Sequence, residues 1–373
     1  MALLDRLGHP ERHFPSVHIG GTNGKGSVAT LVAEALRAAG HRTGLYTSPH
    51  LVSVRERMMV DGTAMSDDAF VTWTRALEDT IVESGASFFE ATTAIAFADF
   101  AARHVDLAVI EVGLGGRLDA TNVLNPLASA VTQISREHTD YLGESLTQIA
   151  EEKAGIAKPG RPFVIGERDP DLAQVLEQAA RRTGALTVRV DPQRVYGGCL
   201  ALHGAHQRRN AAVAEAVLAA LPATYCPPGD AITSGFARAW LPGRCDRRGR
   251  WLFDVAHNPA GLETLIATME EINPPRPISA LVGILSDKDW HPMLQAMLSR
   301  VDRVYVTVPP SAPADRVWSL HEVSQAVPSV VPVPDFDRAL ALAQTDAATV
   351  IVTGSFHTVG DAMSRLPGFA PVQ

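Results

Sequence analysis

The sequence is poor in cysteine and lacks long apolar runs. Only three cysteines occur in 373 residues, Cys199, Cys226 and Cys245, and no two of them form a Cys-x-x-Cys pair. This excludes a disulfide framework or a zinc knuckle and predicts a protein of a reducing compartment. No stretch approaches the ~18 consecutive apolar residues of a membrane span, so we expect no membrane partner.

Basic residues are not in excess either. The formal net charge is −8, which argues against a nucleic-acid partner bound by bulk charge. The first residues, 1–6, have no apolar signal core, which favours a cytoplasmic protein. With 46% hydrophobic and 20% charged residues the composition is that of a globular protein. The length predicts two domains, because one domain usually takes ~150 residues.

Lysine is the scarcest of the common charged residues. Of 33 basic side chains only four are lysines, Lys25, Lys153, Lys158 and Lys288, and the rest are arginines. Lysine offers a compact point charge and a nitrogen that can lose its proton, and arginine offers neither. The four lysines are therefore candidates for positions at which arginine cannot serve.

The N-terminal part predicts a parallel sheet covered by helices on both faces. Apolar runs without alternation lie at residues 17–19, 107–110, 127–134 and 162–165, and helical patterns separate them. After the first run comes a glycine-rich turn and then a helical pattern that ends near Gly40. This order is typical of an α/β fold with a P-loop parallel-sheet ATPase domain.

The C-terminal part predicts a smaller, Rossmann-like α/β domain. The predicted strands lie near residues 251–253, 280–283, 303–308 and 349–352, and the predicted helices near 261–272, 292–300, 320–326 and 336–344. Asn258 and Pro259 suit the start of its first helix. A helical run at 210–221 and a proline-rich loop precede it, so we place the domains at 1–235 and 236–373.

The glycine-rich turn predicts a nucleotide phosphate site. Its backbone N–H groups can surround a phosphate, the following helix adds positive potential, and Lys25 adds a full charge. The turn departs from the strict Walker A pattern, because Ile19 takes the first glycine position and Gly26 separates Lys25 from Ser27. A simple tight turn is the alternative. The candidate ATP-binding residues are Gly21, Thr22, Asn23, Gly24, Lys25, Gly26 and Ser27.

Further motifs follow this turn along most of the chain. They are Thr-Ser-Pro-His-Leu at 47–51, Glu-Val-Gly-Leu-Gly-Gly-Arg-Leu-Asp-Ala-Thr-Asn at 111–122, Glu-Lys-Ala-Gly-Ile at 152–156, Pro-Gly-Arg at 242–244, Asp-Val-Ala-His-Asn-Pro at 254–259, Asp-Lys-Asp at 287–289 and Gly-Ser-Phe at 354–356. With Gly-Thr-Asn-Gly-Lys-Gly-Ser at 21–27, the chain resembles the folylpolyglutamate synthase/dihydrofolate synthase family, a branch of the Mur-type amide ligases.

The resemblance implies a reaction and its cofactors. ATP would phosphorylate the carboxylate of dihydropteroate or a folate, and the amine of L-glutamate would attack the acyl phosphate. Lys25, Lys153, Glu111 and His138 match the family's catalytic positions, and Ser48, Glu111 and His138 match its metal ligands. The implied cofactors are magnesium, as two ions, and a carbamate on Lys153, while a monovalent cation stays open. A plain helix-surface lysine is the alternative for Lys153.

The resemblance also implies the remaining contacts. Asn210, Arg244 and Asp254 match family positions for ATP, and Ser87, Phe88, Phe89, Glu90, Leu118, Asp119 and Ala120 match stretches that contact dihydropteroate. The two phenylalanines could instead be core residues under a helix. The roles of His257 and Lys288 stay open, a helix-entry position and a salt-bridged loop being the structural alternatives.

Three functions compete at this point. The first is a bifunctional dihydrofolate and folylpolyglutamate synthase, or a monofunctional form of it, acting as a cytoplasmic monomer on small molecules. The second is a Mur-type ligase for another acid, and the third is a nucleotide-binding switch that does no ligation. Only 19 residues precede Gly20, fewer than is usual in the family, so either the start is truncated or the folate pocket is built differently.

Overall fold

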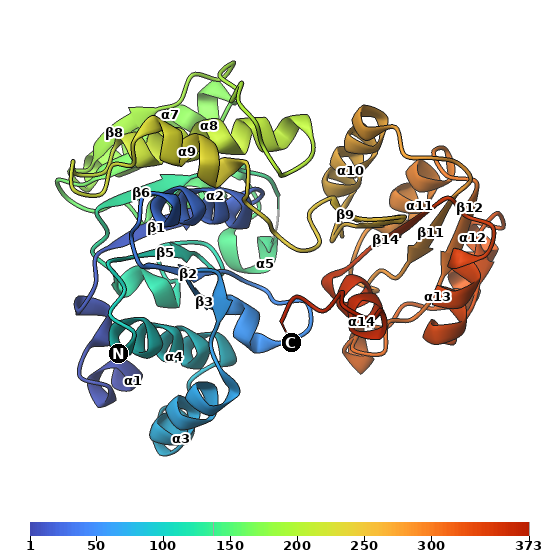
Figure 1. Cartoon of the computed structure of the whole chain (residues 1–373), viewed down its shortest axis with the longest axis horizontal. Helices are drawn as coiled ribbons and strands as arrows, with labels where there is room; N and C mark the ends of the chain where they lie inside the picture. The colour runs from blue at the N-terminus through green and yellow to red at the C-terminus, as the bar shows by residue number, and fades with distance from the viewer. Residues whose placement is uncertain (137, 373) are drawn as a thin grey trace. The chain divides into compact units, whose positions relative to one another are not determined.

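The computed structural model describes residues 1–136 and 138–372, and it divides into two compact units (Figure 1). The first unit holds residues 1–49, 54–201 and 207–240. The second holds residues 50–53 and 202–206 and the chain from Leu241 onward. Among the described residues, no helix has the length and apolar character needed to cross a bilayer.

The first unit is built around one sheet of eight strands. The strands are β1 (Ser16–Gly20), β2 (Thr43–Tyr46), β3 (Met58–Val60), β4 (Thr63–Ala64), β5 (Leu107–Glu111), β6 (Ala128–Val131), β7 (Pro162–Ile165) and β8 (Leu186–Arg189). The helices are α1 (Ala2–Arg6), α2 (Lys25–Ala38), α3 (Asp67–Ser84), α4 (Phe88–Ala102), α5 (Thr139–Leu142), α6 (Leu146–Ala154), α7 (Pro170–Arg182), α8 (Ala205–Ala219) and α9 (Gly229–Phe236), and the 3-10 turns are η1 (Pro10–Arg12), η2 (Val54–Arg57) and η3 (Ala120–Val123).

The order of strands in this sheet is β4-β3-β2-β5-β1-β6-β7-β8. From β2 to β8 every neighbouring pair is parallel, whereas β3 and β4 add an antiparallel edge that the sequence did not predict. The central strands β1, β5 and β6 are buried along their whole length, which is why their apolar runs do not alternate. The predicted α/β class with a parallel-dominated sheet is confirmed.

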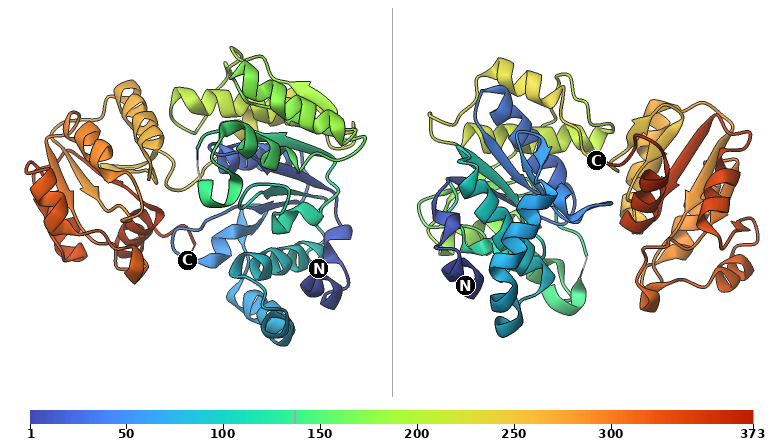
Figure 2. Two further views of the ribbon diagram at one scale, coloured as in Figure 1. Left: turned by 180° about the vertical axis from the view of Figure 1, so that it is seen from behind. Right: turned by 60° about the horizontal axis from the view of Figure 1, so that its bottom comes forward.

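Helices cover both faces of the sheet. Phe97 and Phe100 of α4 pack with Ala108 and Ile110 of β5, and α2 lies on the opposite side of the strands (Figure 1). The views of Figure 2 show the same layering from behind and from below. Because all the parallel strands run in one direction, β1, β2 and β5 end at one edge of the sheet. The loops that follow them carry the candidate site residues.

The predicted strand at 127–134 is too long, because β6 ends at Val131. The next residues support the glycine-rich turn after β1 instead of extending the pairing with β7. Thr132 donates its hydroxyl to the carbonyl of Asn23 at 2.7 Å, and the carbonyl of Gln133 accepts the N–H of Thr22 at 2.6 Å. The segment therefore belongs to the candidate site and not to the sheet.

The second unit is a six-stranded α/β layer structure. Its strands are β9 (Asp246–Arg248), β10 (Trp251–Phe253), β11 (Ile278–Val282), β12 (Arg303–Val306), β13 (Val331–Pro332) and β14 (Thr349–Thr353), and its helices are α10 (Pro259–Ile272), α11 (Trp290–Leu298), α12 (Leu320–Ala326), α13 (Phe336–Gln344) and α14 (Phe356–Arg365), with the 3-10 turn η4 (Ala314–Arg316). The order is β13-β12-β11-β14-β10-β9, and only β9 runs antiparallel to its neighbour. Asn258 caps α10 by accepting the N–H of Gly261 at 2.7 Å, as predicted.

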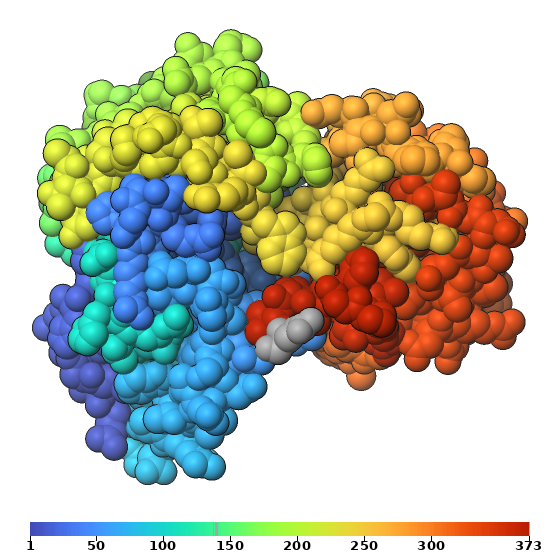
Figure 3. Space-filling view, viewed as in Figure 1, coloured from blue at the N-terminus to red at the C-terminus, as the bar shows by residue number. Residues whose placement is uncertain are grey.

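A glycine permits the close packing of α9 against α2. Space filling shows α9, in yellow, directly on the blue α2 segment (Figure 3). A Cβ atom on Gly235 would lie 2.6 Å from both Cα and N of Ala35, whereas a Cβ on Gly229 of the same helix would meet nothing within 4 Å. The contact of the two helices therefore requires glycine at position 235 alone.

We predict that Gly235→Ala destabilises the first unit by about 1–3 kcal/mol, because the added methyl pushes two helix backbones apart. Gly229→Ala is the matched control, and we expect it to be neutral or to stabilise by up to ~1 kcal/mol, since alanine is the better helix former. Thermal denaturation of both variants measures the difference. Equal melting temperatures would contradict the packing described here.

Candidate active site

The glycine-rich turn after β1 has a backbone conformation that favours glycine at two positions. Gly21 has φ +134° and Gly24 has φ +87°. Gly24 is the N-cap residue of α2 and provides no side chain, so no N-cap side chain bonds the first N–H groups of the helix. N–H groups at a helix start favour an anion, which agrees with the predicted phosphate site. We call residues 20–26 the phosphate loop.

Neighbouring segments fix the loop from several sides. A Cβ on Gly21 would overlap the hydroxyl of Thr132, and one on Gly24 would lie 2.5 Å from Oδ1 of Asn210. The hydroxyl of Thr22 bonds both the carbonyl and the N–H of Ser135, at 3.2 and 3.1 Å. Asn210 is thus placed against the loop by α8, in the part of the sequence that we expected to meet ATP.

Two lysine side chains reach this loop. Lys25, the first residue of α2, donates its ammonium to the carbonyl of Thr22 at 3.1 Å. Lys153, in the last turn of α6, donates to the carbonyl of Gly21 at 2.8 Å and is only 1% exposed. The structure therefore corrects the alternative of a surface lysine for Lys153. It brings together two positive charges that are 128 positions apart in the sequence.

A carboxylate ends the neighbouring strand at the same sheet edge. Glu111 is the last residue of β5 and is 4% exposed, and its Oε2 accepts the N–H of Ser48 at 3.0 Å. Carboxylate and hydroxyl oxygens are the hard donors that magnesium prefers, so the donors of Glu111 and Ser48 fit such an ion. In the described part of the chain, no three His, Cys, Asp or Glu side chains are grouped as ligands of one metal.

The third expected metal ligand, His138, directly precedes the short helix α5. Its backbone has φ +48°, and its carbonyl accepts the N–H groups of Tyr141 and Leu142 at 2.9 and 3.0 Å. The imidazole is exposed. Its preceding residue, Glu137, lies outside the described residues.

Ser87 and Glu90 form a capping box at the start of α4. The hydroxyl of Ser87 accepts the N–H of Glu90, and the carboxylate of Glu90 accepts both the N–H and the hydroxyl of Ser87 at 2.8 and 2.7 Å. These bonds, the side-chain bond first, hold the pKa of Glu90 below its ordinary value. Both residues were expected to contact the substrate, and both also have a local structural role.

The two aromatic residues between them lie in different surroundings. Phe88 is 58% exposed, and the guanidinium carbon of Arg57 lies 5.3 Å from the centre of its ring. The ring of Phe89 lies flat against Gly113, where a Cβ atom would come within 2.3 Å of it. Phe89 therefore packs on residues 113–116, which we call the glycine run after β5, and Phe88 offers an open aromatic face.

The glycine run closes on itself through Asp119. Its carboxylate accepts the N–H of Leu114 at 2.8 Å and that of Thr121 at 2.9 Å. Burial raises the pKa of Asp119, and its bonds to these donors oppose the increase. Leu118 is 80% exposed beside it. Asp119 thus shapes the loop from within while Leu118 faces outward.

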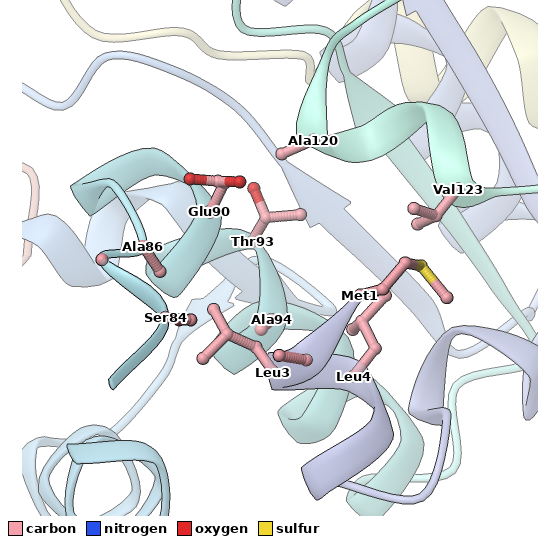
Figure 4. A pocket seen from close by; sticks show the side chains of 12 residues that line it. Met1, Leu3, Leu4, Ser84, Ala86, Glu90, Thr93, Ala94, Ala120 and Val123 are labelled. Atoms are coloured by element: carbon pink, nitrogen blue, oxygen red, sulfur yellow. The ribbon is translucent and has the colours of Figure 1, made fainter. Parts of the chain in front are cut away.

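A cavity of about 420 Å³ lies between α1, the start of α4 and η3. Its lining residues are mostly apolar, and the carboxylate of Glu90 and the hydroxyl of Thr93 reach it from α4 (Figure 4). Ala120 and Val123 form the opposite wall. Two residues that were expected to bind the substrate, Glu90 and Ala120, therefore border one hollow.

In the second unit, Asp254 holds the turn that carries Arg244. Its Oδ2 accepts the N–H of Cys245 and its Oδ1 accepts the N–H of Ala256, both at 2.9 Å. Burial raises the pKa of Asp254, and the charge of Arg244 opposes the increase. The guanidinium of Arg244 lies over the ring of Phe356, 5.2 Å from its centre. Asp254 thus has a structural task besides the expected contact with ATP.

His257 and Lys288, whose roles the sequence did not decide, both have partners nearby in the chain. The Nδ1 atom of His257 bonds the carbonyl of Val255 at 2.9 Å, next to the start of α10. Lys288 pairs with Asp287 at 3.0 Å, and Arg316 pairs with the same carboxylate. The salt-bridged loop that was the structural alternative for Lys288 is what the structure contains.

Sequence reasoning missed two buried polar residues near the site. Arg57 is 8% exposed, and burial lowers the pKa of its guanidinium while Tyr46 and Glu111 oppose the decrease. His18 is fully buried in β1 and bonds Thr121 at 2.7 Å. A single histidine within an apolar strand was a visible signal for His18. The environment of Arg57 depends on contacts with β2, α4 and β5, which the sequence does not display.

Two protein families match the two parts of the chain. The Mur ligase middle domain matches residues 19–196, and the Mur ligase glutamate ligase domain matches residues 243–356. The first match contains the phosphate loop, Glu111 and Lys153, and the second contains Arg244 and Asp254.

Characterised relatives resemble nearly the whole chain. The dihydrofolate synthase/folylpolyglutamate synthase of Mycobacterium tuberculosis is 36% identical over 97% of this chain and 88% of that protein. The enzyme of the same name from Escherichia coli is 35% identical over 92% of this chain and 85% of its own length.

Solved structures agree with this. The E. coli protein in complex with DHPP and ADP has a TM-score of 0.87 and 33% identity, covering 97% of this chain and 91% of that one. A bifunctional folylpolyglutamate synthase/dihydrofolate synthase with Mn, AMPPNP and L-glutamate bound has a TM-score of 0.84 and 33% identity, with coverages of 97% and 92%. The chain thus belongs to the folylpolyglutamate synthase/dihydrofolate synthase family of the Mur ligase superfamily.

Proposed function

We propose that the chain is an ATP-dependent ligase that joins L-glutamate to dihydropteroate and to folates. A carboxylate oxygen of the acceptor attacks the γ-phosphorus of ATP and releases ADP. The amine of glutamate then attacks the acyl carbon, so that phosphate leaves and an amide forms. The observation that carries the proposal is the meeting of Lys25 and Lys153 at the phosphate loop, at the sheet edge where Glu111 ends β5.

The phosphate loop binds the nucleotide in this proposal. Backbone N–H groups at the start of α2 hold phosphate oxygens, and Lys25 moves its ammonium from the Thr22 carbonyl to the charge that develops during transfer. Asn210 lies beside Gly24 and supports the loop there. Arg244, a fork of N–H donors, and Asp254, a carboxylate, are further proposed contacts with ATP.

Magnesium would be held by Ser48 and Glu111, with His138 as a further ligand, and two ions are proposed. Bound ions would neutralise charge on the phosphate oxygens as two anions approach each other. The backbone N–H of Ser48 fixes one oxygen of Glu111 before any ion arrives. This fixed carboxylate lowers the reorganisation needed when the reactants bind.

A carbamate on Lys153 is the finer part of the proposal. A neutral primary amine can add carbon dioxide and a guanidinium cannot, which agrees with lysine at this buried position of an arginine-rich chain. The carbamylated nitrogen retains one N–H, which can still donate to the carbonyl of Gly21. The modification turns a cation into an anion that can support a metal ion beside Glu111.

The cavity bordered by Glu90 and Ala120 supports a pterin-bearing substrate. A flat heterocycle suits its mixed walls, because alkyl side chains can face the ring and the carboxylate of Glu90 can pair with ring N–H groups. Phe89 packs on the adjoining glycine run and Asp119 bonds it. In this proposal Phe88 and Leu118, which are exposed, complete the contacts with the substrate. We further propose that the protein is a monomer and that it acts in the cytoplasm. The three free cysteines suit a reducing compartment.

The ligase and the rival nucleotide switch differ in what ATP hydrolysis requires. We expect sustained ADP release by the purified protein to need magnesium, dihydropteroate and L-glutamate together. Without dihydropteroate no acyl phosphate can form, and without L-glutamate the acyl phosphate is not consumed, so ADP release stops after a single turnover. A coupled assay for ADP measures this, and mass spectrometry of the product identifies the amide. ADP release that is independent of both acids would favour the switch.

Lys25→Ala should abolish turnover and leave the fold intact, because this side chain supplies charge and not packing. Loss of such a contact costs on the order of 3 kcal/mol or more, which lowers the rate by at least about a hundredfold. Arg37→Ala, at the other end of α2, is the control and should keep full activity. Activity of Lys25→Ala within a few-fold of the parent would refute the phosphate-loop role.

Lys153→Arg and Lys153→Ala should both be inactive, but only the alanine variant should respond to added acetate or formate. The shortened side chain leaves space for a small carboxylate that replaces the carbamate anion, whereas arginine fills this space with the wrong charge. NMR of the parent enzyme in 13C-bicarbonate provides a second measurement and should show a carbamate signal that Lys153→Arg lacks. An active arginine variant without that signal would end the carbamate proposal.

A further inference from the structure

A histidine is buried in the middle of the central sheet of the first unit. His18 lies on β1, two residues before Gly20, and none of its surface is exposed. Its Nε2 atom lies 2.7 Å from the hydroxyl oxygen of Thr121, and its Nδ1 atom is buried without a hydrogen-bond partner. Burial, and then the charge of Lys158, lowers the pKa of His18 to about 3, so the ring is neutral at physiological pH.

The hydrogen bonds define the direction of a short chain. Oδ1 of Asp119 already accepts the N–H of Thr121 at 2.9 Å, and the hydroxyl of Thr121 donates to the same oxygen. Since that hydroxyl has one proton, it must accept from His18, so Nε2 carries the ring proton. The chain runs from His18 through Thr121 to Asp119, and Nδ1 is left as a buried acceptor.

This chain reaches the wall of the cavity. Thr121 lies in η3, whose residues Ala120 and Val123 border the hollow opposite Glu90 (Figure 4). Lys158 holds the same turn by donating to the carbonyl of Asn122 at 2.9 Å. The turn is therefore attached by the side chains of His18 and Lys158. His18 belongs to β1, the strand that leads into the phosphate loop.

Stability alone does not account for the histidine. A buried acceptor without a partner costs free energy, and an apolar residue at a central strand position would avoid this cost. What the imidazole adds is a directed bond that fixes η3 relative to β1. His18 is therefore placed to hold the cavity wall formed by η3 at a fixed distance from the phosphate loop.

We infer that His18 and Thr121 are positioning residues for the acceptor acid: through Asp119 they hold η3 so that its cavity wall fits the pterin-bearing substrate. The inference rests on the proposed function, because it takes that cavity as the acceptor site. Neither residue touches the nucleotide in this inference, so substitutions of them should change the affinity for the acceptor acid and not that for ATP.

The test compares Thr121→Val with Thr121→Ser. Valine has nearly the shape of threonine and removes both bonds, whereas serine retains the hydroxyl. We expect the valine variant to raise the Kd of pteroic acid, measured by calorimetry, and the KM of dihydropteroate by about tenfold, the effect of losing a bond to a charged group. The KM of ATP should stay near that of the parent, and the melting temperature should fall by only a few degrees because the buried Nε2–H of His18 loses its acceptor. The serine variant should match the parent throughout.

Equal acceptor affinity in the valine and serine variants would overturn the inference. A parallel rise of the KM values for ATP and for the acceptor, together with a large fall in melting temperature, would also overturn the inference. That outcome would show that the substitution destabilises the whole unit. Should Thr121→Val fail to fold, His18→Leu removes the donor and leaves the bond between Thr121 and Asp119, and the same rise in acceptor Kd is expected. If the wild-type protein binds pteroic acid but forms no amide, the proposed function is refuted, and the comparison of the Thr121 variants still decides the inference. If the wild-type protein does not bind pteroic acid, the inference itself is refuted.

Discussion

The hydrogen bond from the Lys153 ammonium to the Gly21 carbonyl is the contact on which the candidate site depends. It joins the end of α6 to the phosphate loop, although the two lie 132 positions apart. Glycine residues allow many backbone conformations, so contacts with neighbouring segments must hold this loop in a single one. Lys153, Thr132 and Asn210 supply that constraint from α6, from the segment after β6 and from α8.

The glycine run after β5 belongs to the same constraint. A Cβ on Gly116 would lie 2.8 Å from the carbonyl oxygen of Lys153, and a Cβ on Gly155 would lie 2.6 Å from the Cα atom of Arg117. The run and the end of α6 therefore pack backbone against backbone. Asn122 joins them further by donating to the carbonyls of Arg117 and Gly155 at 3.0 and 3.1 Å. Because Lys153 is carried by this helix end, the run fixes where its amine meets the phosphate loop.

Local patterns predicted much of the fold but only part of the site. Strands such as 162–165 and helices such as 336–344 agree with the structure, because burial and helical periodicity are properties of neighbouring residues. The capping box of Ser87 and Glu90 was also readable as Ser-x-x-Glu, yet the aromatic residues between them drew attention to the substrate. The end of β6 at Val131 was not readable, because it depends on bonds to a loop more than a hundred positions away.

The scarcity of lysine now has a physical explanation in the first unit. Lys25, Lys153 and Lys158 each donate an ammonium N–H to a backbone carbonyl, that of Thr22, Gly21 and Asn122, respectively. A single carbonyl between packed backbones accommodates a compact ammonium, whereas the wide fork of a guanidinium would leave further buried donors without acceptors. The sequence indicated these positions by composition alone, but it singled out Lys25 and Lys153 because motifs surround them. Lys158 holds η3 in the same way, through the carbonyl of Asn122. The sequence did not indicate this role, because it depends on the contacts of η3 with β1 and with the cavity.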